Sequence, residues 1–258
     1  MKISVLIPTN RPDSLALAQA SLDRQSFKDF EILVGSPQEP SFGRWVKDDF
    51  EGGYWSLNRV YNRLISESRG ELLVSLQDFI WVPPDGLQKF WNVYARTRGA
   101  TTGIGDSYVT VGLEGEHGPP FWRDPRRILH RKPSIRDDET MRQVKWLSRA
   151  IHHEWNYGSF PRQAILNVGG MDEELDFLGY GCDNLSANER MFEHGTPCFI
   201  DFGNEIVAQH HHKPAHWERL ALAHGKYHSR KMELKERKSW PVLTDEGRMP
   251  SRHRDPLP

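Results

Sequence analysis

Three short stretches of this 258-residue sequence contain side chains that could do chemistry. Asp78 follows an apolar, strand-like run in VSLQDFIWVPPD, and Asp183 lies in GYGCDN, just ahead of a predicted helix. A run of three histidines, His210–His212, comes later. A strand-end carboxylate can bind a divalent metal, a carboxylate facing a cleft can act as a general base, and imidazole is a common metal ligand.

Each stretch also has a purely structural interpretation. Asp78 could be a turn residue at the end of its strand, and Asp183 could only cap the following helix. The histidines could form a solvated loop. In an extended segment His210 and His212 would point one way and His211 the other. Three consecutive histidines lack the i, i+4 spacing of a helical zinc site, so a tightly bound zinc is not expected.

The loop after the first predicted strand lacks a glycine-rich phosphate motif. Its sequence PTNRPD matches neither GxGxxG nor a P-loop. Any bound phosphate must then be held otherwise, and a divalent metal on a strand-end carboxylate is the predicted substitute. Cys182, beside Asp183, is not expected to be a nucleophile. His152 and His153 are expected at the surface or in contact with substrate.

The composition is typical of a protein with a packed core, at 37% hydrophobic and 27% charged residues. A formal net charge of −1 argues against bulk attraction to nucleic acid or anionic lipid. Two cysteines exclude a disulfide framework and favour a reducing compartment. The N-terminus is typical of a strand rather than a signal peptide, and no run reaches the roughly 20 apolar residues of a membrane span. The sequence predicts a cytoplasmic protein without a membrane span.

The first half of the sequence alternates between strand and helix patterns. Short continuous apolar runs indicate strands buried on both faces, and the intervening stretches have the periodicity of amphipathic helices. Strand, helix and strand at this spacing predict a parallel sheet. The predicted strands are Lys2–Ile7, Phe30–Val34, Glu71–Leu76 and Ala100–Val111, and the predicted helices include Ser56–Ser68 and Gly86–Tyr94.

The second half is less regular. Leu113–Arg142 is rich in Gly, Pro and mixed charge, which predicts an irregular insertion of about thirty residues. Beyond it the patterns predict ordered structure again, then a basic helix and a frayed tail. These elements are Trp155–Phe160, helices Pro161–Asn167 and Asn184–His194, strands Pro197–Asp201 and Glu205–Gln209, helix Pro214–Glu236 and the tail Asp245–Pro258.

Taken in order, several of these pieces resemble a family-2-type glycosyltransferase with the GT-A fold. They are KISVLIPTNRP, FEILVGS, SRGELLVSL, QDF followed by VPPD, and VGGMDEELDFLGYGCDN ahead of a helix ending in HG. The resemblance implies an α/β fold, with a single Rossmann-like, mostly parallel sheet flanked by helices, an irregular insertion and a C-terminal helical extension. Residues 1–112 would be the nucleotide-sugar-binding half, 113–212 the acceptor-binding half, and 213–258 a basic helix and tail.

The resemblance also implies a reaction. A sugar would move, with inversion, from a nucleotide-diphosphate sugar, with a UDP-sugar favoured, to a glycan or another hydroxyl acceptor. Asp183 would be the catalytic base. Mn²⁺ or Mg²⁺ would be held by Asp78 and by a histidine, either His210 or His212. The family commonly has Asp-x-Asp at the metal motif, whereas Gln77-Asp78-Phe79 keeps only the middle acid.

The remaining site residues follow from the same resemblance. The donor nucleotide would contact Pro8, Thr9, Arg11, Ser36, Glu39, Asn58, Gln77 and Asp78. The acceptor would contact Trp155, Tyr180 and Asn184.

Three other functions are compatible with the sequence. A degenerate relative could bind a nucleotide sugar or a glycan without catalysis. A phage-type enzyme could glycosylate modified bases in DNA, with the basic segment Arg219–Lys238 contacting phosphates, although interspersed acids make a solvated helix face the favoured interpretation of that segment. A nucleotidyltransferase would need a glycine-rich, basic first loop, and PTNRPD supplies only Arg11.

Overall fold

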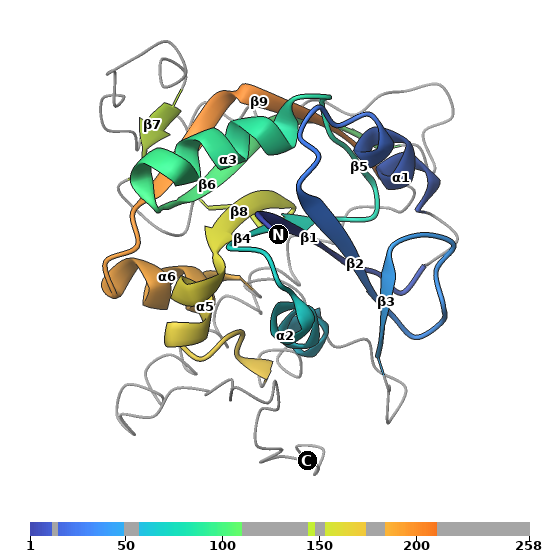
Figure 1. Cartoon of the computed structure of the whole chain (residues 1–258), viewed down its shortest axis with the longest axis horizontal. Coiled ribbons are helices and arrows are strands. Elements are labelled where there is room, and N and C mark those ends of the chain that lie inside the picture. Colours follow the sequence, from blue (N-terminus) through green and yellow to red (C-terminus); the bar gives the residue numbers. More distant parts are fainter. Residues whose placement is uncertain (12–14, 49–56, 110–143, 148–152, 174–183, 211–258) are drawn as a thin grey trace.

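The computed structural model describes residues 1–11, 15–48, 57–109, 144–147, 153–173 and 184–210. Asp183, Tyr180, His212, the predicted insertion 113–142 and the predicted basic helix 214–236 lie outside these residues. The described residues form one sheet with helices on both of its faces (Figure 1).

The sheet is mixed, but most of its strands run in one direction. Its order is β3-β2-β1-β4-β8-β6-β9-β5, and β7 also pairs with β9. The parallel pairs are β1 with β2 and β4, β2 with β3, and β6 with β9. Since β8 is antiparallel to both β4 and β6, those two strands also point the same way. The strands are β1 Ile3–Pro8, β2 Phe30–Ser36, β3 Arg44–Lys47, β4 Leu72–Leu76, β5 Ile80–Trp81, β6 Ala100–Val109, β7 Val144–Trp146, β8 Tyr157–Pro161 and β9 Cys198–His210.

Two helix layers cover the sheet. In Figure 1, α1 and α3 lie on one face, and α2, α5 and α6 lie on the other. None of the helices in the described ranges combines the length and the hydropathy needed to cross a bilayer. The helices are α1 Ala16–Asp23, α2 Leu57–Glu67, α3 Gly86–Thr97, α5 Arg162–Asn167 and α6 Leu185–Glu193.

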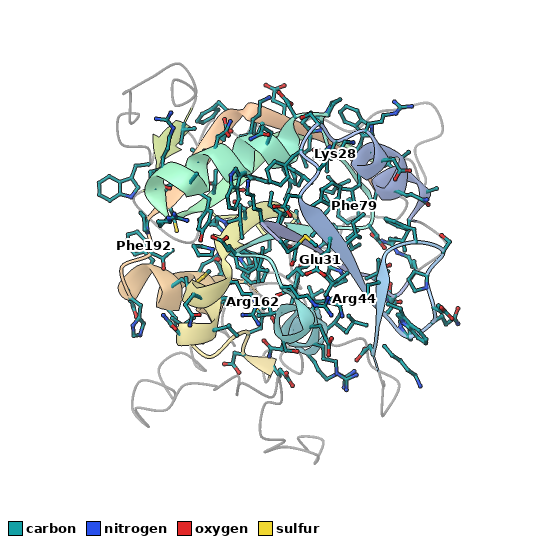
Figure 2. The ribbon with its side chains drawn as sticks, in the orientation of Figure 1. Lys28, Glu31, Arg44, Phe79, Arg162 and Phe192 are labelled. Carbon is teal, nitrogen blue, oxygen red and sulfur yellow. The ribbon has the colours of Figure 1, made fainter. Side chains whose placement is uncertain are left out.

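The apolar pattern of β1 explains this layering. Successive side chains of a strand point to opposite faces. Val5 and Ile7 therefore join the hydrophobic cluster under α1 and α3, whereas Leu6 joins the cluster over α2. All three are fully buried, and burial of such a side chain stabilises the fold by about 1.5–3 kcal/mol. Side chains fill the space between the sheet and both helix layers (Figure 2).

The structure corrects the sequence prediction of the strands in two respects. The short strands β3, β5 and β7 were not predicted. The two strands predicted at 197–201 and 205–209 are one strand, β9, whose pairing with β6 shifts register between Thr102 and Ile104. The polar segment that interrupts the apolar pattern, from Asp201 to Asn204, lies at this irregularity.

His153 is a buried structural residue rather than a surface or substrate-contacting one. Its side chain is fully buried, and its ring Nε2 lies 3.0 Å from the Ser159 carbonyl oxygen. Its own carbonyl accepts hydrogen bonds from Asn184 (3.0 Å) and Asn188 (2.8 Å). Desolvation lowers the pKa of His153 to about 4, although its hydrogen bonds oppose this shift. His153 thus links β8 to the beginning of α6 while uncharged.

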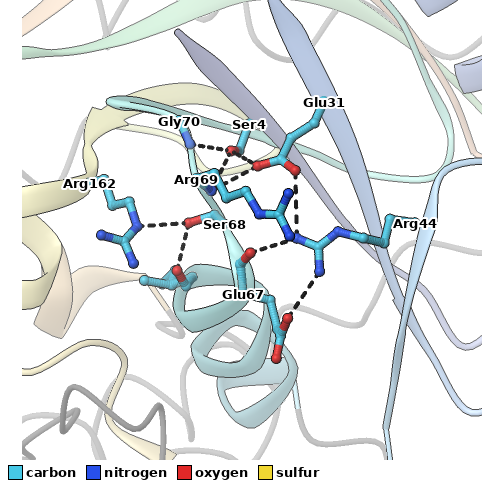
Figure 3. Close-up of polar contacts among 9 residues, drawn as sticks. Ser4, Glu31, Arg44, Glu67, Ser68, Arg69, Gly70 and Arg162 are labelled. Atoms are coloured by element: carbon cyan, nitrogen blue, oxygen red, sulfur yellow. Dashed lines mark hydrogen bonds and ion pairs between the residues drawn. The ribbon is translucent and has the colours of Figure 1, made fainter. Parts of the chain in front are cut away.

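At the edge where β1, β2 and β4 begin, a polar network joins five chain segments (Figure 3). Glu31 accepts hydrogen bonds from the Ser4 hydroxyl (2.7 Å) and from the Arg69 backbone N–H (2.8 Å), and it lies 3.6 Å from Arg44. Arg44 also pairs with the exposed Glu67 (3.0 Å). Ser4 accepts a further bond from the N–H of Gly70, where a Cβ would lie only 2.4 Å from the Ser4 nitrogen. Glycine is therefore required there.

The first prediction concerns this network. Glu31→Ala should lower the free energy of unfolding by about 1–3 kcal/mol, because it leaves the buried Ser4 hydroxyl without its acceptor and the Arg69 N–H with only its longer bond to Ser4 Oγ (3.3 Å). Glu67→Ala is the matched control, since it removes an exposed carboxylate from the same arginine and should cost less than about 1 kcal/mol. Urea unfolding of both variants measures the difference. Equal losses would contradict the role given to Glu31.

The second prediction concerns pH. The pKa of His153 is depressed in the folded chain, so the unfolded chain binds a proton first as the pH falls below about 6.5. The stability that depends on neutral His153 is present above this pH and is lost as the pH falls towards 4. With these values the loss between pH 7.5 and pH 5 is about 2 kcal/mol. His153→Gln should lack this part of the pH dependence, as measured by urea unfolding at both pH values. The same change in the free energy of unfolding between the two pH values for both proteins would refute the role of His153.

Candidate functional site

The candidate site lies at the carboxyl ends of β1, β2 and β4. After β1 the chain builds β2 and β3 on one side of it, and then returns to place β4 on the other side. Ligands of open α/β sheets bind at such a reversal of strand order, outside the carboxyl ends of the strands. Thr9 follows β1, Ser36 ends β2, and Asp78 follows β4. The structure thus brings together the three strand ends that the sequence singles out.

Asp78 is the centre of this cluster. It is 3% exposed, and its two carboxylate oxygens accept hydrogen bonds from two different residues. The Thr9 hydroxyl donates to Oδ2 (2.7 Å), and Nη2 of Arg11 donates to Oδ1 (2.8 Å). The backbone N–H of Arg11 in turn donates to Thr9 Oγ1 (2.9 Å). The loop after β1 is therefore folded onto the end of β4 by a closed set of hydrogen bonds.

The end of β2 is held in a similar way. Pro8, the last residue of β1, pairs with Gly35, and the Thr9 N–H donates to the Gly35 carbonyl (2.9 Å). Ser36 is buried, and its hydroxyl donates to the Gln38 carbonyl (2.6 Å). Trp45 of the unpredicted strand β3 donates its indole N–H to the Ser36 carbonyl (3.0 Å). These bonds fix the backbone at the edge of the site.

The other predicted donor-site residues differ in exposure. Glu39 is exposed beyond the end of β2, whereas Asn58 is fully buried on α2. Gln77 is half-buried, and its backbone N–H donates to the Asn156 carbonyl (3.1 Å). Phe79 is buried among the residues packed under α1 and α3 (Figure 2). An aromatic ring in that position anchors the turn and offers no ligand atom.

The described residues do not fit a metal held by Asp78. Both of its oxygens are engaged by Thr9 and Arg11, and a guanidinium 2.8 Å away occupies one side of the carboxylate. Within the described ranges no group of three His, Cys, Asp or Glu side chains is arranged to hold a metal ion. The predicted ligand His212 lies outside these ranges.

The backbone of His210 does reach this edge of the sheet. Ile80 pairs with Ala208 in the antiparallel ladder of β5 and β9, and His210 follows two residues later. Asp78 precedes Ile80 by two residues, so the ladder carries both positions toward the same end of the sheet. The backbone of His210 therefore ends at the same edge of the sheet as Asp78.

Trp155, expected to contact an acceptor, lies in the core instead. It is 3% exposed, its ring stacks on Phe160 with the centroids 4.1 Å apart, and it meets Tyr61 edge-on at 5.0 Å. Its indole N–H donates to Asn188 Oδ1 (2.7 Å). Trp155 therefore has a packing role that joins β8, α2 and α6.

The segment that contains Asp183 and Tyr180 is anchored at both of its ends. Glu173 precedes it and accepts a hydrogen bond from Asn62 of α2 (2.8 Å), while burial raises the pKa of Glu173. Asn184 follows it and is half-buried, with its side-chain amide bonded to the His153 carbonyl. Both anchors belong to elements that pack against the sheet.

Sequence reasoning missed a second charged cluster at the same edge. Asp48, which follows β3, is 2% exposed and receives hydrogen bonds from Nε (3.2 Å) and Nη2 (3.1 Å) of Arg59. Arg63 lies 3.7 Å from it, and the Asp48 N–H donates to the Ser36 carbonyl. The i, i+4 spacing of the two arginines on one helix face was the available signal. This cluster joins α2 to the ends of β2 and β3.

Comparison with known sequences finds no family model and no curated protein that matches the chain. Solved structures do match. TarS residues 1–349 from S. aureus superposes with a TM-score of 0.57 at 11% identity, covering 81% of this chain and 60% of that one. The same protein in complex with UDP-GlcNAc gives a TM-score of 0.58 at 11% identity, covering 83% and 60%.

A structure of GalNAc-T7 with UDP, GalNAc and Mn²⁺ matches equally well. Its TM-score is 0.57 at 11% identity, and the match covers 82% of this chain and 44% of that one. This chain therefore spans 60% or less of the length of these solved chains. Similarity at this identity establishes architecture, and it confirms the fold implied by the sequence. The chain has the GT-A fold in common with these solved structures.

Proposed function

We propose that this chain is an inverting glycosyltransferase that moves a sugar from a nucleotide-diphosphate sugar to an acceptor hydroxyl. The observation that carries the proposal is the cluster of Thr9, Arg11 and Asp78 at the reversal of strand order in a GT-A sheet. Such a reversal is where open α/β sheets bind their ligands. Arg11 supplies a cation there, and its guanidinium is suited to phosphate oxygens.

A UDP-sugar is the proposed donor. TarS has been solved with UDP and with UDP-GlcNAc, and GalNAc-T7 with UDP and GalNAc. In this chain the fixed backbone around Thr9 and Ser36 would border the nucleoside. Glu39 is exposed beside this edge and could reach a ribose hydroxyl. The sugar and the acceptor hydroxyl would then lie towards the segment that contains Asp183.

The proposed reaction is a single displacement. Asp183 takes the proton of the acceptor hydroxyl while the oxygen attacks the anomeric carbon, and the bond from that carbon to the diphosphate breaks. The nucleoside diphosphate leaves with the bonding electron pair, so the anomeric configuration inverts. The role of Asp183 rests on the resemblance seen in the sequence, in which the acid after the GGMDE element is the base.

The resemblance seen in the sequence predicts Mn²⁺ or Mg²⁺, but the described residues around Asp78 give no support to that prediction. The Mn²⁺ in the GalNAc-T7 structure belongs to that protein. In this chain Asp78 does not fit as a ligand while Arg11 and Thr9 hold its oxygens. No step of the proposed reaction therefore depends on a metal held by Asp78.

The third prediction tests the catalytic base. Asp183→Asn should lower the rate of sugar transfer by about 10²–10⁴-fold, because an amide cannot accept the proton, a contribution typical of general base catalysis. Donor binding should stay the same. The measurement is release of UDP from UDP-sugars in the presence of candidate glycan acceptors, with affinity for UDP determined separately by calorimetry.

Glu193→Gln is the matched control, because it removes an exposed acid from α6 and should leave the rate unchanged. Turnover by Asp183→Asn at the original rate would remove Asp183 from the mechanism. Binding of UDP-sugars without any transfer by the unaltered chain would favour the alternative of a non-catalytic binding module. Transfer to hydroxymethylated bases in duplex DNA, but to no glycan, would favour the DNA-modifying alternative.

A further inference from the structure

The pairing of Asp78 has a consequence for the charge of the site. Asp78 is buried, and its two oxygens accept hydrogen bonds from Thr9 and from Arg11. A buried carboxylate is stable as an anion only when it is paired and hydrogen-bonded. Here both requirements are met by the chain itself, through the loop that follows β1.

The loop geometry holds Arg11 in this position. Thr9 Oγ1 accepts from the Arg11 N–H (2.9 Å) and at the same time donates to Asp78 (2.7 Å). The Thr9 N–H continues the backbone pairing of β1 with β2. The guanidinium is thus aimed at Asp78 by its own backbone, yet its side chain is 38% exposed and remains accessible from solvent.

The charges of Asp78 and Arg11 offset each other before a nucleotide binds. An Asp-x-Asp motif places two carboxylates beside one divalent ion, whereas this turn has one carboxylate, with an amide before it and a phenyl ring after it. Two carboxylates and one divalent ion have no net charge together, and the same is true of one carboxylate and one guanidinium. A divalent ion on the same carboxylate would lie next to a cation that is never deprotonated in proteins, and the two would repel each other.

We propose that Arg11, oriented by Asp78, is the cation that binds the donor's diphosphate, and that nucleotide binding by this chain needs no divalent metal. The proposal rests on the donor site described under the proposed function. A guanidinium presents several N–H donors in one plane and binds phosphate oxygens in pairs. Asp78 is then a positioning residue that sets the direction of the Arg11 guanidinium.

The first arm of the test uses the unaltered chain. Its affinity for UDP is measured by calorimetry in EDTA and again with Mn²⁺, and GDP, ADP, CDP and dTDP are measured in the same way. For the tightest-binding diphosphate we expect dissociation constants that agree within about twofold, since no metal takes part. A dissociation constant at least tenfold higher in EDTA would overturn the proposal and leave the proposed transferase function intact.

The second arm compares the diphosphate with its parent nucleoside. Arg11→Ala should weaken binding of the diphosphate by roughly 10–100-fold, the range expected for a lost charged hydrogen-bond pair, and leave binding of the nucleoside unchanged. Arg11→Lys should recover part of the loss, and Arg24→Ala, which removes an exposed arginine next to α1, should have no effect. Equal weakening of diphosphate and nucleoside would overturn the proposal, because Arg11 would then only shape the loop.

Failure of the proposed function gives a different result. If no nucleoside diphosphate binds the unaltered chain, with or without Mn²⁺, both the donor site and the role of Arg11 are wrong. The EDTA comparison needs no substitution, so the outcome does not depend on whether a variant folds.

Discussion

A buried carboxylate must be neutralised where it lies, and Asp78 meets this requirement by drawing the loop after β1 onto the end of β4. The rest of the site follows from that contact. It closes the gap between two neighbouring strands at the reversal of strand order, and it places Arg11 at the rim of this edge. The same contact pairs the carboxylate with the guanidinium of Arg11. Asp78, which in the sequence resembles what is left of a metal motif, accepts a hydrogen bond from Arg11 in the structure.

The two halves of the chain are held together by hydrogen bonds that cross the sheet and helix layers. β8 lies between β4 and β6 and runs in the opposite direction, so it joins the strands before α3 to the later elements. Asn62 of α2 bonds both to the Met171 backbone and to Glu173, which fixes the GGMDE stretch beneath the same helix. The segment that contains Asp183 therefore starts and ends on parts of the structure that the sheet already positions.

The sequence was sufficient for the fold class and for the strand end that carries Asp78. Continuous apolar runs and helical periodicity are local signals, and they located β1, α2 and β4 to within two residues at each end. The pairing of Asp78 with Arg11 could not be read in this way, because 67 residues separate them and only the folded sheet brings them together. The sequence suggested a metal for the same carboxylate, since a motif gives residue types but not their partners.

The burial of some polar and aromatic residues also could not be predicted from the sequence. Trp155 and His153 looked like surface or substrate contacts, but inside the core the Trp155 indole N–H donates to Asn188 and His153 Nε2 lies beside the Ser159 carbonyl. These partners come from elements that pack only after the sheet forms. The direction of β8 could not be predicted from the sequence either, because a short apolar strand has the same pattern whether it pairs parallel or antiparallel.

The network around Glu31 lies where β1, β2 and β4 begin, and the candidate site lies where they end. β1 has six residues, so the two edges are separated by about 20 Å of extended chain. The strands therefore carry the Glu31 network at one edge of the sheet and the candidate substrate site at the opposite edge. An attachment point for a surface, a dye or a fusion partner would therefore best be chosen at Lys28, which is exposed just before β2 and outside this network, so that the tether would leave the opposite edge open to nucleotide and acceptor.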